Sequence, residues 1–275
     1  MRIPALIHVA VVAVSLVSGC RSSSESASLA ARPFQKLPEA ASDEAKLFAV
    51  AFDFDTDSCY PSPAISTRGE LNPGLPSGVV YVRPCRERSQ LTNSNTYHRE
   101  VSIRRRGRTY TVHMYALYFM VDRNWAGGHR HDWEYALVWL TDGRLTHGSR
   151  SAHGGLKTLP VAELEFDPGR RNTLKIVYHK NWGRTHAFRF AHSDERGDEN
   201  AENHLRRWVT PTLVDWFEMK SDDVSNRQLR RKLNNHDFGS ANCSVNNHNF
   251  PNNIAKNPPA GYPSPLEWRE AIERQ

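Results

Sequence analysis

The chain has 275 residues, of which 39% are hydrophobic and 10% aromatic, and this composition supports a real buried core. The formal net charge is +6, but the basic residues are spread along the chain and no nucleic-acid-binding motif accompanies them. A chain without a core is therefore excluded, and we expect no nucleic-acid partner.

The first 20 residues have the features of a signal peptide. Arg2 supplies a positive charge, and an apolar run from Ala5 to Val17 follows that is too short to span a bilayer comfortably. The run ends in Leu16-Val17-Ser18-Gly19-Cys20, which resembles a bacterial lipobox in which Cys20 would be lipidated. The alternative is an ordinary signal peptide cut nearby. We expect a secreted protein, or one anchored to the outer membrane through Cys20.

Residues 21–42 are rich in Ser and Ala without an apolar period, and we interpret them as a flexible tether before a single domain at 43–275. Export permits disulfides. Cys59 and Cys85 both flank turn-rich segments and form the favoured pair. Cys243 is then left over, either as a buried thiol or as a sign that this pairing is wrong.

Apolar periodicity predicts strands first and helices late in the chain. A short helix is expected at 43–51, and a hairpin with Gly107 at its turn joins 101–103 to 109–114. Further strands are expected at 79–82, 115–121, 135–140, 173–179 and 187–192, and helices at 200–219 (kinked at Pro211), 226–233 and 265–274. This order predicts a mainly β fold, a single-domain β-sandwich with peripheral helices.

The run Gly128-His129-Arg130-His131-Asp132-Trp133-Glu134 is the most informative stretch, because it gathers potential metal ligands directly before an apolar strand. Strand alternation places Asp132 and Glu134 on one face and sends Trp133, Tyr135, Leu137 and Trp139 to the other, a core face. His129 lies in the preceding loop and can fold back over the acids. Asp122 ends the preceding strand and lies opposite them if the two strands are hairpin neighbours.

Carboxylates this close repel one another unless a proton or a cation intervenes. An oxygen-rich ligand set favours Mg²⁺ or Ca²⁺, with Mn²⁺ as a further option. Zinc is less favoured, although His147, His153 and His186 keep it open. Two other interpretations are a salt-bridge cluster, in which Arg130 pairs with Asp132 or Glu134, and a paired-carboxylate glycosidase. The glycosidase is disfavoured because acids at i and i+2 on one strand lie on the same side of a ligand.

The run 128–134 resembles the heptapeptide signature of the necrosis- and ethylene-inducing peptide-like proteins, abbreviated NLPs. Other segments agree with this family in the same order: 69–75 followed by Cys85-Arg86, 176–179 with Trp182 and Thr185-His186, 237–242, and 249–256. The resemblance covers roughly residues 50–260 and, with the lipobox, suggests a bacterial member.

The resemblance implies a β-sandwich similar to actinoporins and some lectins. It implies a monomeric virulence factor and cytolysin that binds sugar headgroups of plant glycosylinositol phosphorylceramide sphingolipids at the membrane surface. By position, the required divalent cation would be bound by Asp122, His129, Asp132 and Glu134. His186 would line the same cavity, Trp182 would meet the membrane, and Arg130 and His131 would contribute to headgroup or membrane binding.

Two departures from the family pattern bear on toxicity. The stretch from Asp122 to His129 is one residue shorter than in cytolytic members, and Thr185 replaces an acidic residue that some toxic members carry. A non-cytolytic, lectin-like protein that binds glycan or triggers plant immunity is therefore a second hypothesis. A metal-dependent hydrolase is a third, although the sequence shows no arrangement of nucleophile and base.

Overall fold

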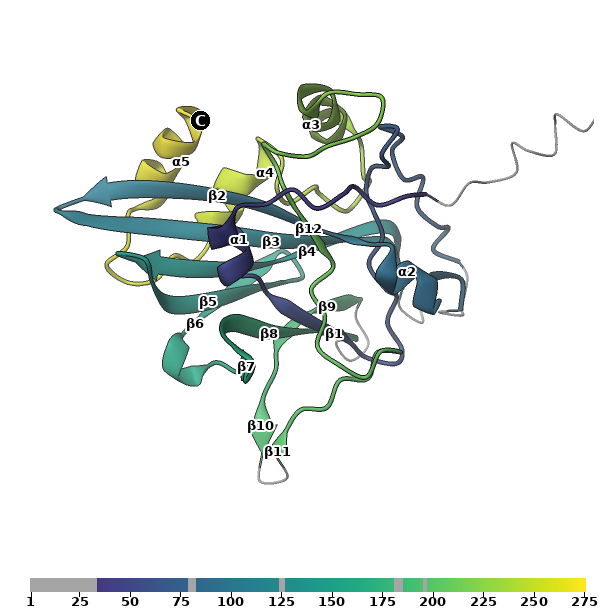
Figure 1. Ribbon diagram of the computed structural model, residues 1–275, viewed down its shortest axis with the longest axis horizontal. Helices are drawn as coiled ribbons and strands as arrows, with labels where there is room; N and C mark the ends of the chain where they lie inside the picture. The colour runs from purple at the N-terminus through teal and green to yellow at the C-terminus, as the bar shows by residue number, and fades with distance from the viewer. Residues whose placement is uncertain (1–33, 79–82, 124–126, 181–184, 195–196) are drawn as a thin grey trace, which may run out of the picture. The chain divides into compact units, whose positions relative to one another are not determined.

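The heptapeptide at 128–134 lies in the largest sheet, at the start of one of its strands. The computed structural model describes residues 34–78, 83–123, 127–180, 185–194 and 197–275. The predicted signal segment with Cys20, the predicted strand at 79–82 and Trp182 lie outside these residues. The sheet has six strands in the order β12-β2-β3-β4-β5-β6 (Figure 1). Their bounds are β2 Asn95–Arg105, β3 Arg108–Asp122, β4 His129–Thr141, β5 Arg144–Ala152, β6 Gly155–Pro160 and β12 Thr212–Asp215.

The β2–β3 hairpin was predicted around Gly107, and the structure confirms it. Arg106 and Gly107 have φ of 51° and 78°, the left-handed conformation that a two-residue hairpin turn requires. All pairs in this sheet are antiparallel except β12, which runs parallel to β2.

A second sheet is built around β8 (Arg170–Lys180), which pairs with β1 (Ala51–Phe54), β7 (Phe166–Asp167) and β9 (His186–Phe190). The short strands β10 (Ser193–Asp194) and β11 (Gly197–Asp198) form a separate antiparallel pair. The strands predicted at 173–179 and 187–192 thus correspond to β8 and β9.

The helices are short and peripheral: α1 Asp43–Leu47, α2 Arg88–Thr92, α3 Asn226–Asn235, α4 Asn249–Ile254 and α5 Pro265–Glu273, with single 3₁₀ turns at Arg83–Cys85 and Val161–Glu163. Local capping explains where α3 and α5 start. The hydroxyls of Ser225 and Ser264 accept hydrogen bonds from backbone amides of the first turn, and Pro265 occupies the first turn of α5.

Side chains of β3 and β4 alternate between two cores, one on each face of the larger sheet. On one face they pack against α3, α4 and α5; on the other they pack against the second sheet (Figure 1). The helix-side core includes Met114, Tyr118, Trp133, Tyr135, Leu137, Trp139, Leu229, Phe250 and Trp268, and the core between the sheets includes Leu117, Phe119, Val138, Phe52, Ile176 and Phe188. The mainly β sandwich with peripheral helices is confirmed, as is the core face of β4 that begins at Trp133. Each fully buried large side chain contributes about 1.5–3 kcal/mol.

The helix predicted at 200–219 is wrong. This segment contains β12, where Leu213 and Val214 are buried and pair with Thr96 and Tyr97 of β2. The Trp216 amide continues the ladder and donates to the His98 carbonyl at 2.7 Å. Pairing with an existing strand satisfies these backbone groups and outweighs the helical spacing of the apolar residues.

The folded region also begins before residue 43. Leu37 is fully buried and its amide donates to Asn95 Oδ1 at 2.9 Å. The Ala40 amide donates to the Leu213 carbonyl at 3.1 Å. The part of the predicted tether from residue 34 onward is therefore bound to the domain, because its few apolar residues find a place in the core.

The cysteines behave as the sequence suggests. Cys59 and Cys85 form a disulfide, and Cys243 is a free, buried thiol. Burial raises the pKa of Cys243 to about 12, so the thiol is protonated and inert at neutral pH. Within the described ranges, no helix has the length and apolar character needed to cross a membrane.

Candidate cation-binding site

A cavity of about 330 Å³ lies where β3 ends and β4 begins. One wall is acidic and imidazole-bearing, made by Asp122, His129, Asp132, Glu134 and His186. Another wall comes from the C-terminal segment and is rich in amides: Asn242, Asn249, Asn252 and Asn253, together with Lys256. The structure thus places all four predicted cation ligands around one cavity, together with His186.

The turn between β3 and β4 fixes the first pair of ligands. Asp122 and His129 are directly opposite one another in the strand register, as predicted. Gly128 has φ of 84°, and a Cβ placed there would lie 2.2 Å from the Asp122 carbonyl oxygen. Only glycine permits this close return of the chain, and this explains the glycine that opens the heptapeptide.

His131 has φ of 61°, and this left-handed residue interrupts the alternation of β4. As a result His129 and Asp132, three positions apart, line the same cavity. His131 itself lies in the helix-side core, where its Nδ1 is 2.6 Å from the Tyr118 hydroxyl. Arg130 is exposed and donates to the Pro73 carbonyl at 3.0 Å. Arg130 and His131 thus do not line the cavity, and their part in headgroup or membrane binding stays a prediction.

Hydrogen bonds leave lone pairs of Asp122 and His129 free. The Nδ1–H of His129 donates to the His131 carbonyl at 2.7 Å, so Nε2 carries a lone pair, and it faces Asp122 Oδ2 at 3.7 Å. Asp122 Oδ1 accepts from both the backbone amide and the Nδ1 of His186, each at 2.9 Å. One ligand atom from each of Asp122, His129 and Asp132 lies within 4.8 Å of the others, and this donor set fits a single cation.

The two acids of β4 are buried and held by hydroxyl donors. Tyr178 Oη donates to Asp132 Oδ2 at 2.9 Å, and the Ser151 hydroxyl makes a short hydrogen bond to Glu134 Oε2. Burial, reinforced by Asp122 and Glu134, raises the pKa of Asp132 well above its usual range. Burial also raises the pKa of Glu134 to about 8. A site with these properties binds either protons or a metal cation at neutral pH.

The salt-bridge interpretation is wrong for these acids. In the part of the chain that the structure describes, no Lys or Arg forms an ion pair with Asp122, Asp132 or Glu134. Arg150, outside the cavity lining, and Lys256, within it, lower the pKa of Glu134, but burial outweighs both and raises it. Among the described residues the acids thus have basic groups in the vicinity but no direct ion pair with a Lys or Arg, as a structural salt-bridge cluster would have.

The zinc and glycosidase interpretations find little support in this geometry. His147 does not line the cavity, and the Nδ1 of His186 is already engaged by Asp122. His153 lines the cavity on the side of Thr185, with its Nδ1 3.5 Å from the Thr185 hydroxyl. Asp132 and Glu134 lie on one wall, as the strand spacing predicted, so they do not flank a bound sugar.

Comparison with known proteins identifies the family. The sequence model for the necrosis inducing protein family (NPP1) matches residues 42–257. The chain belongs to this NLP family. It is 27% identical over 203 residues to NLP effector protein 2 of Phytophthora capsici, covering 70% of each chain. It is also 27% identical over 211 residues to the necrosis-inducing protein NPP1 of Phytophthora nicotianae, covering 71% of this chain and 74% of that one.

Solved structures give the same fold. NLPPya in complex with mannosamine superposes with a TM-score of 0.61 at 28% identity, covering 82% of this NLP chain and 94% of that chain. The non-toxic HaNLP3 protein superposes with a TM-score of 0.62 at 24% identity, covering 84% and 98%. The second likeness bears on fold alone. Since a non-toxic protein has this fold as well, the fold by itself does not establish toxicity.

Sequence reasoning missed several residues that complete the site. Tyr178 and Ser151 support the two buried acids, and the amide wall lines the same cavity. The asparagines of that wall lie in the family-like segments 237–242 and 249–256, so their position in the sequence was noted but their role was not. A serine on a neighbouring strand carries no sequence signal of this kind.

Proposed function

We propose that this NLP protein is a secreted effector that binds a sphingolipid sugar headgroup through a divalent cation held by Asp122, His129, Asp132 and Glu134. Damage to the plant plasma membrane follows from that binding. The observation that carries the proposal is the cavity itself: its lining combines acids that have no basic ion-pair partner among the described residues with a wall rich in amides.

Mg²⁺ or Ca²⁺ fits this wall best, with Mn²⁺ as a further option, because three carboxylates outnumber one imidazole. A hydrated hard cation keeps water ligands that sugar hydroxyls can replace. Its charge also offsets the burial and the repulsion from Asp122 and Glu134 that together raise the pKa of Asp132. The chain's own residues orient the ion: Tyr178 holds Asp132, and His186 holds Asp122.

The amide wall supplies donors and acceptors for a sugar. Asparagine side chains offer both kinds of group, and sugar recognition needs both. NLPPya, which is 28% identical, forms complexes with mannosamine and with glucosamine. These complexes support a sugar ligand for this family member as well. The lipid we propose is a plant glycosylinositol phosphorylceramide.

Export and membrane contact complete the proposal. The signal segment at 1–20 would deliver the protein outside the cell, with Cys20 as a lipid anchor on the outer membrane. Trp182 is proposed to meet the target membrane, since an indole has an apolar body and a polar N–H group. His186, four positions later in the sequence, lines the cavity.

Dye release from vesicles tests the lytic step. Folded protein with Mg²⁺ or Ca²⁺ should release dye from vesicles that contain the plant sphingolipid and should leave vesicles without it intact. Absence of release with metal present would exclude the lytic role.

A second candidate is a non-cytolytic glycan-binding protein. Thr185 favours it, because the residue before His186 contributes a hydroxyl to the cavity and no carboxylate. This candidate predicts binding to the same vesicles without dye release. A metal-dependent hydrolase would instead turn over a glycan or phosphodiester, and Asp132→Asn would abolish that turnover.

A further inference from the structure

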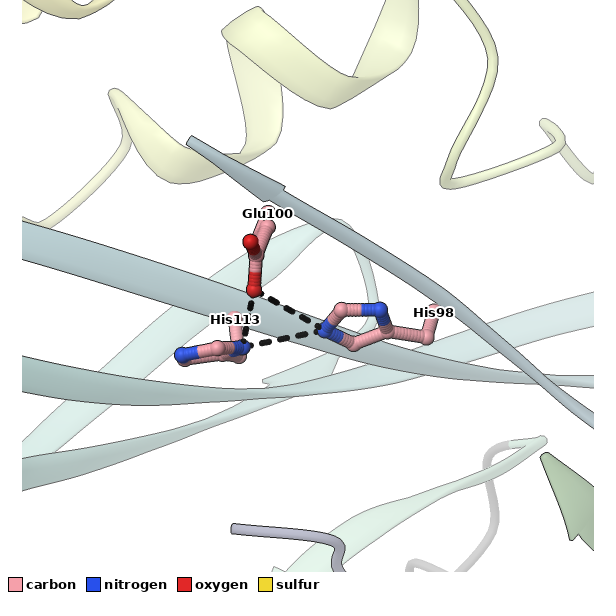
Figure 2. A group of neighbouring side chains, drawn as sticks. All are labelled: His98, Glu100 and His113. Carbon is pink, nitrogen blue, oxygen red and sulfur yellow. Dashed lines mark hydrogen bonds and ion pairs between the residues drawn. The ribbon is translucent and has the colours of Figure 1, made fainter. Parts of the chain in front are cut away.

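A second group of potential metal ligands lies away from the cavity, on strands β2 and β3. His98 and Glu100 are two positions apart on β2, so their side chains lie on the same face of the sheet. His113 of β3 is directly opposite Glu100 in the register. Figure 2 shows the three side chains converging on one point from these two neighbouring strands. His98 and His113 are completely or almost completely buried, whereas the Glu100 side chain is 39% exposed.

The three ligand atoms have the spacing of a coordination triangle. His98 Nε2 lies 3.0 Å from His113 Nδ1 and 3.8 Å from Glu100 Oε2, and His113 Nδ1 lies 2.9 Å from Glu100 Oε2. Zinc bound at about 2.0–2.1 Å in a tetrahedron separates its ligand atoms by roughly 3.3 Å. The group therefore needs only small adjustments to hold one ion.

Asp215 of β12 sets the tautomer of His98. Its Oδ2 lies 2.7 Å from His98 Nδ1, so this nitrogen carries the proton and donates to the carboxylate. The Nε2 lone pair of His98 is then directed at the other two ligand atoms (Figure 2). In zinc sites, the ring nitrogen of a histidine that does not bind the metal commonly donates to a carboxylate, and this hydrogen bond orients the ring.

One proton on His113 has two acceptors within the group. His113 Nδ1 lies 3.0 Å from His98 Nε2 and 2.9 Å from Glu100 Oε2, and among the described residues the buried Glu100 Oε2 has no hydrogen bond of good geometry. His113 Nδ1 is also the only nitrogen of that ring with a polar neighbour, since Nε2 has no hydrogen-bond partner in the described part of the chain. A proton thus satisfies two of the three ligand atoms, whereas a metal ion satisfies all three.

We propose that His98, Glu100 and His113 bind a first-row transition-metal ion, with Zn²⁺ as the best match. Two imidazoles and one carboxylate are a ligand set that zinc uses with an open fourth position. The partly exposed Glu100 gives the ion a path from solvent. A bound ion joins β2 to β3 and, through Asp215, engages β12.

This site is independent of the cavity at the end of β3. Asp122 lies nine positions after His113 on β3, and an extended strand covers about 30 Å over that length. The ligand sets differ as well, since the cavity offers three carboxylates and this group offers one. Loss of one ion should therefore leave binding of the other unchanged.

Zinc titration of the full chain by calorimetry, with excess Mg²⁺ present to occupy the cavity, tests the proposal. We expect one Zn²⁺ per chain for the wild type and for Glu134→Gln, which alters only the cavity. Glu100→Gln and His113→Gln should lose this binding, and Asp215→Asn should weaken it by about 10–100-fold. Bound Co²⁺ should give the visible absorption of a four-coordinate ion in the wild type and not in Glu100→Gln.

The control is His192→Gln, which changes a histidine that is 70% exposed and should leave zinc binding intact. Each variant is first checked for folding by circular dichroism. If His113→Gln does not fold, Glu100→Gln decides, because its partly exposed side chain can be changed without opening the core. Unchanged zinc binding in Glu100→Gln, or loss of zinc in Glu134→Gln, would overturn the proposal.

Discussion

Two positions along β3 carry two different kinds of ionisable cluster. At the carboxyl end, Asp122 joins Asp132, Glu134 and the imidazole of His129 at a cavity. Near the middle of the strand, His113 joins His98 and one carboxylate on one face of the sheet. Among the described residues, the acids of the first cluster form no ion pair with a Lys or Arg, and amides line the same cavity; the second cluster has an outer carboxylate, Asp215, that fixes a tautomer.

This difference shows how the same strand can support two ligand chemistries. Oxygen-rich sets suit hard, hydrated cations that recruit a further ligand such as a sugar. Nitrogen-rich sets with an outer carboxylate suit transition metals. The comparison predicts separable metal selectivity, with Mg²⁺ or Ca²⁺ at the cavity and Zn²⁺ at His98, Glu100 and His113.

The largest expected effect is loss of Mg²⁺ and Ca²⁺ binding in Glu134→Gln and in Asp132→Asn. Each change replaces a buried carboxyl that can ionise when a cation binds with an amide of the same shape that cannot. Calorimetry with each cation should show no binding at concentrations that saturate the wild type. Glu270→Gln, on the exposed surface of α5, is the matched control and should bind normally. Normal affinity in both cavity variants would remove the basis for this site.

The next effect is a pH dependence of stability when cations are chelated. The folded pKa of Glu134 is raised to about 8, above its value in the unfolded chain, so the folded state holds a proton that the unfolded state releases. This stabilising contribution is complete below the unfolded pKa and is lost as pH rises toward about 8. With a chelator, the melting temperature of the wild type should therefore fall over this range more steeply than that of Glu134→Gln.

Excess Mg²⁺ should flatten that pH dependence in the wild type, because the cation replaces the proton. Identical slopes in wild type and Glu134→Gln, with and without Mg²⁺, would show that the buried acid is not the source of the effect.

A smaller effect is expected for Tyr178→Phe. This change removes the hydroxyl that donates to Asp132 Oδ2 but keeps the ring stacked on Phe119. Loss of an outer partner of a metal ligand weakens binding by roughly 10-fold or somewhat more. Mg²⁺ affinity should fall by this amount while Zn²⁺ affinity stays the same, and a fall in both would contradict the independence of the two clusters.

The smallest effect is expected for Arg130→Gln, although Arg130 lies within the heptapeptide. Its guanidinium is directed to the Pro73 carbonyl and forms no ion pair with the acids among the described residues. Mg²⁺ affinity should be unchanged within error by calorimetry. A marked gain or loss would show that Arg130 acts on the cavity after all.

Much of this organisation could be predicted from sequence because it rests on local rules. The turn at Gly107 and the caps of α3 and α5 follow from short-range conformational preferences. The pairing of Asp122 with His129 follows from two strands joined by a short connection. The family-like heptapeptide, together with Asp122, then predicts a set of ligands, and in the structure all of them line one cavity.

The remaining features depend on contacts between distant segments. Residues 212–215 have apolar spacing that also fits a helix, and only the free edge of β2 makes them a strand. Leu37 is ordered because the core has a place for it. His131 turns into the helix-side core because it is left-handed, and strand alternation cannot anticipate such a residue within a strand. The β2–β3 hairpin separates His113 from His98 and Glu100 in the sequence. Only the register between the two strands shows that the three side chains converge.

The central claim is that the cation at the cavity mediates headgroup binding. The most direct test measures binding of the folded protein to vesicles containing plant glycosylinositol phosphorylceramide, with Mg²⁺ and again with a chelator, for wild type and Asp132→Asn. We predict that wild type binds only with Mg²⁺ and that Asp132→Asn binds in neither condition. Equal binding with and without the chelator, or full binding by Asp132→Asn, would contradict the claim.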